Sequence, residues 1–281
     1  HVGGDIKLGT INGDGIYKLS GGTLDMENGQ IEYGTGNQNF HFSGGRLTNL
    51  RLVTSDDPSQ ANLVQSGGTL APGNSPGTTT IEGDYTIQDA GTLEIEIEGV
   101  DTGEFDEVFV GGTASLDGTL DIQLEGDYDA SVGETIVVLT ASNIIGEFSS
   151  VTSTMENDTI MIPLYSSTSM MLCGSTLGDM DVDCDVDLDD IDEFLLALND
   201  PIAYVLQEGY SGETLGDFDN DNDLDFDDVD GFATALGGVL SVQQIVSWIP
   251  EPNTSTLLGI GWLLWHSACI RWRRKRKDSN D

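Results

Sequence analysis

Apolar and polar side chains alternate strictly over two stretches in the first part of the chain. TLEIEIE at 92–98 places leucine and isoleucine on one face and glutamate on the other, and TLDIQLE at 119–125 repeats this arrangement. Alternation with a period of two is typical of strands that bury one face. Residues 1–172 are therefore predicted to be mainly β.

A leucine recurs through the same region at a nearly constant interval. It ends the short signatures SGGTL and SGGRL, and later AGTL and DGTL, in steps of 23 residues with a last step of 27. A period of this length predicts a β-solenoid, in which each coil buries its apolar face against the next. The Gly-Gly pairs supply the bend that leads into each strand. The recurring residues are Leu24, Leu47, Leu70, Leu93 and Leu120.

Two other architectures fit parts of this region. A leucine-rich repeat has a similar period and LTNLRL at 47–52 imitates its spacing, but the other repeats do not follow it and no helical run separates the strands. An antiparallel β-sandwich over roughly 100–172 would suit the longer last step and the continuous apolar run TIVVL at 135–139. The sandwich stays an alternative for that stretch.

Two aspartate-rich tracts follow, each running into a short helical pattern. GDMDVDCDVDLDD at 178–190 and GDFDNDNDLDFDD at 216–228 each hold seven aspartates at the same offsets. Apolar residues then recur at i, i+3, i+4 and i+7, which predicts two amphipathic helices. Asp200-Pro201 is expected to end the first and Gly237-Gly238 the second. The apolar positions are Ile191, Phe194, Leu195 and Leu198, and 38 residues later Val229, Phe232, Ala233 and Leu236.

The charge of the chain decides which partners can neutralise these tracts. The net charge is −39, and no Lys or Arg occurs between Leu52 and Ile270. Nucleic acid is excluded as a partner of this acidic body, because neutralising phosphates needs Lys and Arg. Metal cations or polycationic surfaces are its natural partners. Calcium, a hard cation that takes about six to eight oxygen ligands, is the predicted cofactor.

Both tracts fit the frame of a calcium loop of twelve residues. Ligands come from positions one, three, five, seven, nine and twelve, with the seventh acting through its backbone carbonyl and the ninth directly or through water. The eighth positions, Val186 and Leu224, are apolar and should point inward. One Ca²⁺ in each loop is predicted to be held by Asp179, Asp181, Asp183, Asp185, Asp187 and Asp190, and by Asp217, Asp219, Asp221, Asp223, Asp225 and Asp228.

Two positions depart from this frame. The sixth position favours Gly for its sharp turn, and here it is Cys184 or Asn222. Asn enters the left-handed region readily and Cys does not, so the first loop is expected to be the weaker site. The twelfth residue is Asp rather than Glu, which reaches less far. Cys173 and Cys184 could form a disulfide, a pairing that the sequence leaves open.

The C-terminal segment combines three features in order. IPEP at 249–252 breaks secondary structure, TSTLLGIGWLLWHSACI at 254–270 is mostly apolar, and RWRRKRK at 271–277 has six cations in seven residues. Seventeen residues reach about 26 Å as a helix, the low end of a membrane span. We predict a transmembrane helix over 254–270 with its basic end in the cytoplasm and the acidic body outside. A hydrophobic core helix with a basic tail is the other interpretation.

Three resemblances to known families extend this picture. GGTLAPGNSPGTTTIEGDYTIQDAGTLEIEIEG and the segments after it, within 66–151, resemble the autotransporter-associated passenger repeat, which implies a right-handed parallel β-helix in a surface or secreted protein. The duplicated loop and helix at 178–238 resemble the type I dockerin, which implies folding on calcium and docking onto a cohesin-like partner. The tail resembles the PEP-CTERM sorting signal, which implies that Pro250, Glu251 and Pro252 are recognised by an exosortase-type processing enzyme.

Catalysis is weakly supported by the sequence. Parallel β-helices include polysaccharide lyases and hydrolases, but a lyase needs a cation to neutralise its substrate and residues 52–270 contain no Lys or Arg. A hydrolase needs a defined carboxylate pair, and the acidic residues here are too many for any one to be informative. The three histidines, His1, His41 and His266, form no constellation.

The sequence thus predicts a modular, exported surface protein. Its parts are a β-solenoid over 1–172, expected to be N-terminally truncated, a dockerin-like calcium-binding domain of two EF-hand-like loops over 173–240, and a sorting signal over 241–281. The expected role is non-catalytic adhesion, matrix formation or docking, with a cohesin-like protein or a surface polysaccharide as partner. A fragment of a polysaccharide-degrading enzyme, which the dockerin targets to a scaffold or surface, is the alternative.

Overall fold

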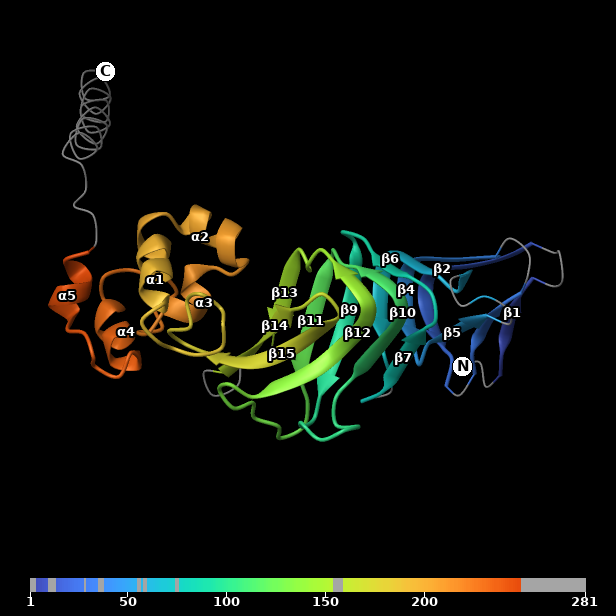
Figure 1. The fold of residues 1–281 in the computed structure, drawn as a ribbon, viewed down its shortest axis with the longest axis horizontal. Helices are drawn as coiled ribbons and strands as arrows, with labels where there is room; N and C mark the ends of the chain where they lie inside the picture. Colours follow the sequence, from blue (N-terminus) through green and yellow to red (C-terminus); the bar gives the residue numbers. More distant parts are fainter. Residues whose placement is uncertain are drawn as a thin grey trace, which may run out of the picture.

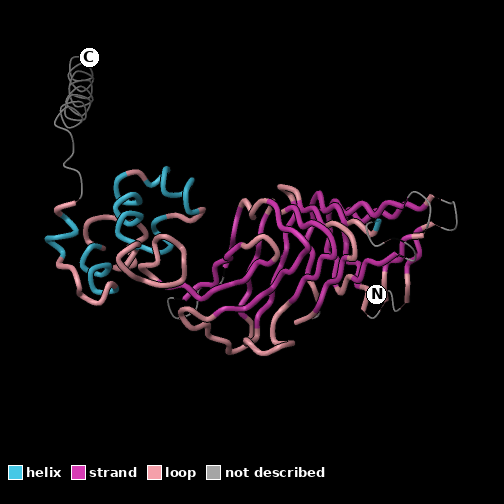
Figure 2. Tube along the Cα trace, in the orientation of Figure 1, coloured by secondary structure: helices cyan, strands magenta, loops and turns pink. Residues whose placement is uncertain are grey.

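The computed structural model of the protein describes residues 4–9, 14–27, 29–34, 38–54, 57, 60–73, 76–153 and 159–248. The molecule is elongated, with the N-terminal strands at one end and the helices gathered at the other (Figure 1). Strands make up the larger part, and they lie side by side as successive coils (Figure 2). The described chain is therefore mainly β, as the alternation of its side chains predicts.

The strands follow one another with short connections. They are β1 (Ile6–Leu8), β2 (Gly15–Asp25), β3 (Ile31–Tyr33), β4 (Gln38–Thr48), β5 (Arg51–Thr54), β6 (Leu63–Ala71), β7 (Thr78–Ile81), β8 (Tyr85–Ile87), β9 (Gly91–Ile97), β10 (Glu107–Ser115), β11 (Thr119–Leu124), β12 (Thr135–Ile145), β13 (Ser150–Ser153), β14 (Thr159–Tyr165) and β15 (Ser169–Thr176).

The recurring leucines stack directly on one another. β2, β4, β6, β9, β11 and β13 pair in parallel, in a register that aligns each leucine with the leucine of the next coil and ends on Val151. All five leucines are at most 5% exposed. A second buried column, formed by Ile31, Leu52, Ile81 and Val110, runs through β3, β5, β7 and β10. Both columns belong to one hydrophobic core, so the parallel β-solenoid is confirmed.

The Gly-Gly pairs lie inside long strands, at corners where the pairing register shifts. The second glycine of each pair has positive φ, 72° at Gly22, 86° at Gly45 and 84° at Gly68. Coils approach closely here, because a Cβ added to Gly68 would lie 2.6 Å from the carbonyl oxygen of Gly45. The glycines therefore allow both the bend and the close stacking of one coil on the next.

Replacing Gly68 with alanine is expected to destabilise the solenoid by about 2–4 kcal/mol, because positive φ and a backbone clash act together. Gly22 is the matched control, since its φ is also positive but no atom lies within 4 Å of an added Cβ. Gly22→Ala should cost only about 1–2 kcal/mol, the conformational part. Urea unfolding followed by the β signal in circular dichroism measures both values. Equal losses would contradict the stacking argument.

The β-solenoid ends in an antiparallel arrangement. β10 and β11 stack in parallel with the strands before and after them, so an antiparallel sandwich over roughly 100–172 is wrong for the stretch up to Ser153. Among the described strands, the antiparallel pairings are those of β15 with β12 and of β15 with β14. TIVVL begins β12, which continues the parallel stack on one side and accepts β15 on the other. β15 runs through the predicted boundary at 172 and ends at Thr176.

Short helices follow the last strand. Those after the aspartate tracts, α1 (Asp190–Asn199) and α4 (Val229–Ala235), form where the apolar spacing predicts them. Three more were not expected: α2 (Pro201–Glu208), α3 (Gly212–Gly216) and α5 (Val242–Val246). Asp200 and Pro201 end α1 as predicted and also start α2, because the Asp200 carboxylate accepts a 3.1 Å hydrogen bond from the Ala203 N–H.

The helices and the two loops form a second core, the helical module. Phe194 of α1 and Phe232 of α4 stack with their ring centroids 3.9 Å apart, and neither is exposed. Ile160 and Ile162 of β14 belong to the same core. The helical module is therefore packed against the last strands of the solenoid and shares buried surface with them.

No helix in the part of the chain that the structure describes is long and apolar enough to cross a bilayer. The predicted transmembrane segment 254–270, the sorting motif at Pro250, Glu251 and Pro252, and the basic run 271–277 lie outside the described residues.

Candidate functional site

Each aspartate tract folds into a loop whose first, third and fifth residues converge. Carboxylate oxygens of Asp179, Asp181 and Asp183 lie within 4.8 Å of one another, and those of Asp217, Asp219 and Asp221 do the same. Two oxygens on opposite sides of one Ca²⁺ would be about 4.6–5.2 Å apart, since each binds at about 2.3–2.6 Å. Either triad could hold a metal ion.

The two loops share one backbone design. In the first, the Asp179 carboxylate accepts hydrogen bonds of 3.0 Å from the N–H groups of Asp183 and Cys184. In the second, Asp217 accepts from Asp221 at 3.2 Å and from Asn222 at 3.0 Å. The first residue of each loop therefore fixes the N–H groups of its fifth and sixth residues.

The twelfth residue closes each loop. One oxygen of Asp190 accepts from the N–H groups of Met180 and Asp181 at 2.5 and 3.1 Å, and the other accepts from Asp187 at 2.7 Å. Asp228 makes the corresponding three bonds in the second loop, at 2.7, 3.2 and 2.8 Å. A carboxylate offers about four acceptor sites, so in each aspartate the oxygen that accepts a single N–H keeps a lone pair for an ion. Whether they bind it stays a prediction.

The seventh and ninth positions lie on the outer side of the loops. Asp185, Asp187, Asp223 and Asp225 are exposed. Asp187 and Asp225 each accept a 2.7 Å hydrogen bond from the N–H two residues later, shortly before the following helix begins. The neighbouring Asp183 charge raises the pKa of the Asp185 carboxyl, and Asp221 does the same for Asp223. The metal-binding roles of these four residues stay predictions.

The first loop crowds negative charge into a partly buried place. Burial, with the charges of Asp190, Asp183 and Asp179 added to it, raises the pKa of Asp181 to about 7. Burial also raises the pKa of Asp190 to about 6, against three backbone N–H donors. Oδ1 of Asp181 is buried and has no hydrogen-bond partner among the described residues. With no Lys or Arg between 52 and 248, no cationic side chain neutralises this crowded group, and a bound cation would both neutralise it and satisfy this oxygen.

Several neighbours position the first loop, and the sequence analysis missed most of them. Ser175 of β15 donates a 2.6 Å hydrogen bond to Asp179, and the Tyr204 hydroxyl of α2 donates a 2.9 Å bond to the Met180 carbonyl. Cys173 and Cys184 form a disulfide, with Cα atoms 6.2 Å apart. This pairing, which the sequence left open, joins the loop to the last strand of the solenoid. The sequence signal that could have identified Cys173 and Ser175 is that both lie a few residues before the first tract.

The apolar eighth residues point toward the second core as predicted. Val186 and Leu224 are partly buried and pack against it. Each lies beside the glycine that precedes its own loop, since a Cβ on Gly178 would be 3.0 Å from Val186 and one on Gly216 would be 2.9 Å from Leu224. The inward apolar residue thus anchors each loop to the helical module.

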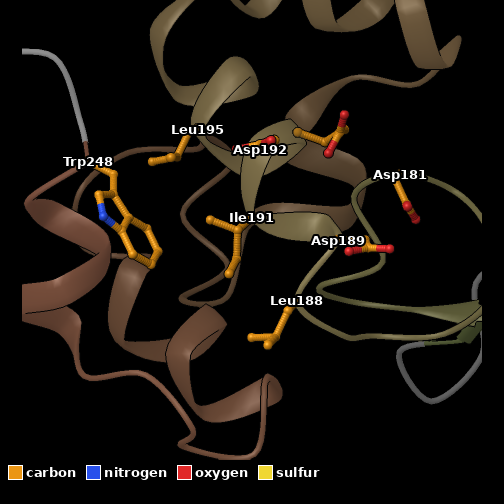
Figure 3. A pocket seen from close by; sticks show the side chains of 8 residues that line it. Asp181, Leu188, Asp189, Ile191, Asp192, Leu195 and Trp248 are labelled. Carbon is orange, nitrogen blue, oxygen red and sulfur yellow. The ribbon is translucent and has the colours of Figure 1, made fainter.

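A solvent-open pocket of about 710 Å³ lies beside the first loop. Asp181 and Asp189 line it on the loop side, and the Trp248 indole stands on the opposite side near Leu195 (Figure 3). Because Asp181 is a candidate ligand, the pocket gives an ion access from solvent to the first triad.

A second group of carboxylates lies on the solenoid, where the glutamate face of β9 is covered. Glu94 is 7% and Glu96 8% exposed, and Glu94 forms a bidentate ion pair with Arg46, one contact of which measures 2.6 Å. Asp106 is fully buried and accepts hydrogen bonds from the N–H groups of Gly77 and Glu96 at 2.6 and 3.0 Å. Arg46 and these backbone N–H groups thus satisfy Glu94 and Asp106 inside the coil.

Asp106 predicts a pH dependence of solenoid stability. Burial, together with the Glu96 and Glu94 charges, raises the pKa of Asp106 to about 7 against the opposing effect of those two N–H donors. Between the unfolded value of about 3.9 and about 7, the folded state keeps a proton that the unfolded state has lost. Stability should therefore fall as pH rises through this window, by at most about 1.4 kcal/mol per unit.

Urea unfolding of Asp106→Asn across pH 4–8 tests this, since the variant should lack that part of the slope. The control is Asp127→Asn, which removes the same charge from an exposed position. Parallel pH curves for wild type and Asp106→Asn would contradict the role of Asp106.

No protein-family model matches the chain, and no curated protein matches it.

Proposed function

We propose that the protein is a non-catalytic, exported modular protein whose helical module binds two Ca²⁺ through its duplicated loops. The observation that carries this is the repetition of one loop design: two acidic triads, in loops where equivalent backbone N–H groups donate to the first and twelfth aspartates. The buried, unpartnered Asp181 oxygen supports a cation in the first loop.

The dockerin-like interpretation adds a docking role. A loop leads directly into a helix twice, α1 and α4 meet through stacked phenylalanines, and the eighth residue of each loop packs inward. These features support a calcium-folded module resembling the type I dockerin. A cohesin-like domain or a surface polysaccharide would be its partner. Docking of the module would then attach the β-solenoid to that partner.

Export is part of the same proposal. The Cys173–Cys184 disulfide supports it, because disulfides persist mainly outside the reducing cytosol. The tail, with its Pro250-Glu251-Pro252 motif, apolar segment and basic run, would anchor the protein until an exosortase-type enzyme processes it. The β-solenoid fold itself is compatible with a non-catalytic protein and with a polysaccharide lyase-like enzyme.

Isothermal titration of the metal-free protein with Ca²⁺ tests the proposal, and two bound ions are expected. Asp217→Asn with Asp219→Asn should remove one of them, because both residues belong to the second triad. The control pair Asp189→Asn with Asp227→Asn removes equal charge outside the predicted ligands and should still bind two. Absence of Ca²⁺ binding by the wild type at millimolar concentration would overturn the proposal.

A further inference from the structure

The two loops have the same ligand frame but different surroundings. Two residues of β15 that lie two positions apart contact the first loop. Cys173 forms the disulfide with Cys184, and Ser175 donates a hydrogen bond to Asp179. Residues at this spacing leave a strand on the same face. The residues at the corresponding place before the second loop, 211–213, belong to the start of α3 rather than to a strand. Among the described residues, the first loop is therefore tied to the last strand of the solenoid by a disulfide and a hydrogen bond that have no counterpart in the second.

The first loop also contains the residues less suited to its backbone. Both loops take positive φ at the fourth and sixth positions, where the second has Asn220 at 60° and Asn222 at 72°. The first has Val182 at 61° and Cys184 at 82°. Asn adopts this region readily, whereas a β-branched valine or a cysteine does so at a cost. The turn that brings the Cys184 N–H to Asp179 is therefore disfavoured by its own residues.

We propose that the Cys173–Cys184 disulfide positions the first calcium site, by holding the sixth residue of the loop in the left-handed turn, so that its oxidation state sets the Ca²⁺ affinity of this site alone. The inference rests on the proposed calcium-binding function and names the regulation of that site. A loop that is already held in its bound shape loses less conformational freedom when the ion binds. The second site needs no such link, because its asparagines tolerate the turn.

Reduction of the disulfide would release the loop. A dithiol supplies two electrons and two protons to the Cys173–Cys184 bond, which yields two thiols, while the dithiol becomes a disulfide. Cys184 is then free to leave the left-handed region. Because coupling is reciprocal, Ca²⁺ at the first site must favour the oxidised form by the same factor by which oxidation favours Ca²⁺.

The experiment follows both sites in one protein. In ¹⁵N spectra of the full chain, the amides of Cys184 and Asn222 report the first and second loops, since each bonds the first aspartate of its own loop. Titration with Ca²⁺ is done with and without a dithiol. The dissociation constant of the first site should rise about tenfold on reduction, equivalent to about 1.4 kcal/mol, while that of the second stays unchanged. Ca²⁺ should also make the disulfide harder to reduce by about 30 mV, the same tenfold factor.

Two double variants test whether the disulfide acts by stabilising the left-handed turn at residue 184 or only by attaching the loop to β15. Cys173→Ala with Cys184→Ala should bind as weakly as the reduced protein at the first site. Cys173→Ala with Cys184→Gly should regain the oxidised affinity without any disulfide, because glycine adopts positive φ freely. If glycine gives no recovery, or if reduction leaves the first site unchanged, the inference is wrong. Failure of Ca²⁺ to bind either loop in any form would instead remove the proposed function itself.

Discussion

Removing Ca²⁺ with EGTA is expected to abolish most of the helical circular dichroism of the protein while its β signal remains. Seven aspartates per loop would then repel one another, and α1 and α4 begin directly at the ends of those loops. Metal binding and folding of this module are thus linked. The solenoid should persist, because its stacked leucine columns form a separate core.

Two comparisons make this result specific. Adding Ca²⁺ back should restore the helical signal, and the Asp189→Asn with Asp227→Asn variant should respond to EGTA as the wild type does. An unchanged signal at 222 nm after complete chelation would show that the helical module folds without metal. Loss of the β signal together with the helical one would show that the two cores unfold as one unit.

Phe232→Ala is expected to destabilise the helical module by about 3–5 kcal/mol, which is enough to unfold a small domain. Phe232 is fully buried and stacks on Phe194, so its removal leaves a cavity at the contact between α1 and α4. Each calcium loop leads into one of these two helices, so the Ca²⁺ affinity should fall when their contact is lost. Thermal unfolding in saturating Ca²⁺ measures the loss.

Phe226→Ala is the matched control for this substitution. Phe226 is the same residue type in the second loop, but it is 60% exposed. Its replacement should change stability by about 0.5 kcal/mol or less. Similar losses for both variants would mean that the stacked pair does not hold the module together.

Much of the fold follows from local patterns in the sequence. The 23-residue step placed Leu24, Leu47, Leu70 and Leu93 in one buried column, and the structure stacks them in register. Apolar spacing likewise placed α1 and α4. The same alternation suggests that the glutamate face of β9 is exposed, but this face is covered and Glu94 pairs with Arg46. Alternation within one strand contains no information about which segment packs over it.

In the candidate site, too, local sequence predicts one part of the structure and contacts between distant segments decide the rest. Spacing within each tract placed the first, third and fifth aspartates together, since that depends only on the local turn. The contacts from Ser175, Tyr204 and Cys173 come from elements that are separate from the loop, and no spacing rule within the tract contains them. They make the first loop more buried than the second.

Two nearly identical heptapeptides show where local sequence stops deciding. CGSTLGD at 173–179 ends a strand, whereas SGETLGD at 211–217 contains helix α3. The first lies between β12 and β14, whose free N–H and C=O groups it pairs with. The second packs against Ala197 of α1 and Leu224 of its own loop. The neighbours available to each copy select its structure.

The sequence by itself determined the solenoid period, the two acidic loops with their helices, and the absence of cationic side chains to neutralise them. These properties are local or compositional, so they are independent of which distant segments meet. Only the tertiary structure decided that β15 runs antiparallel, that Asp106 is buried, and that Cys184 joins Cys173. Each of these depends on a pairing between separate segments, which packing of the whole chain selects.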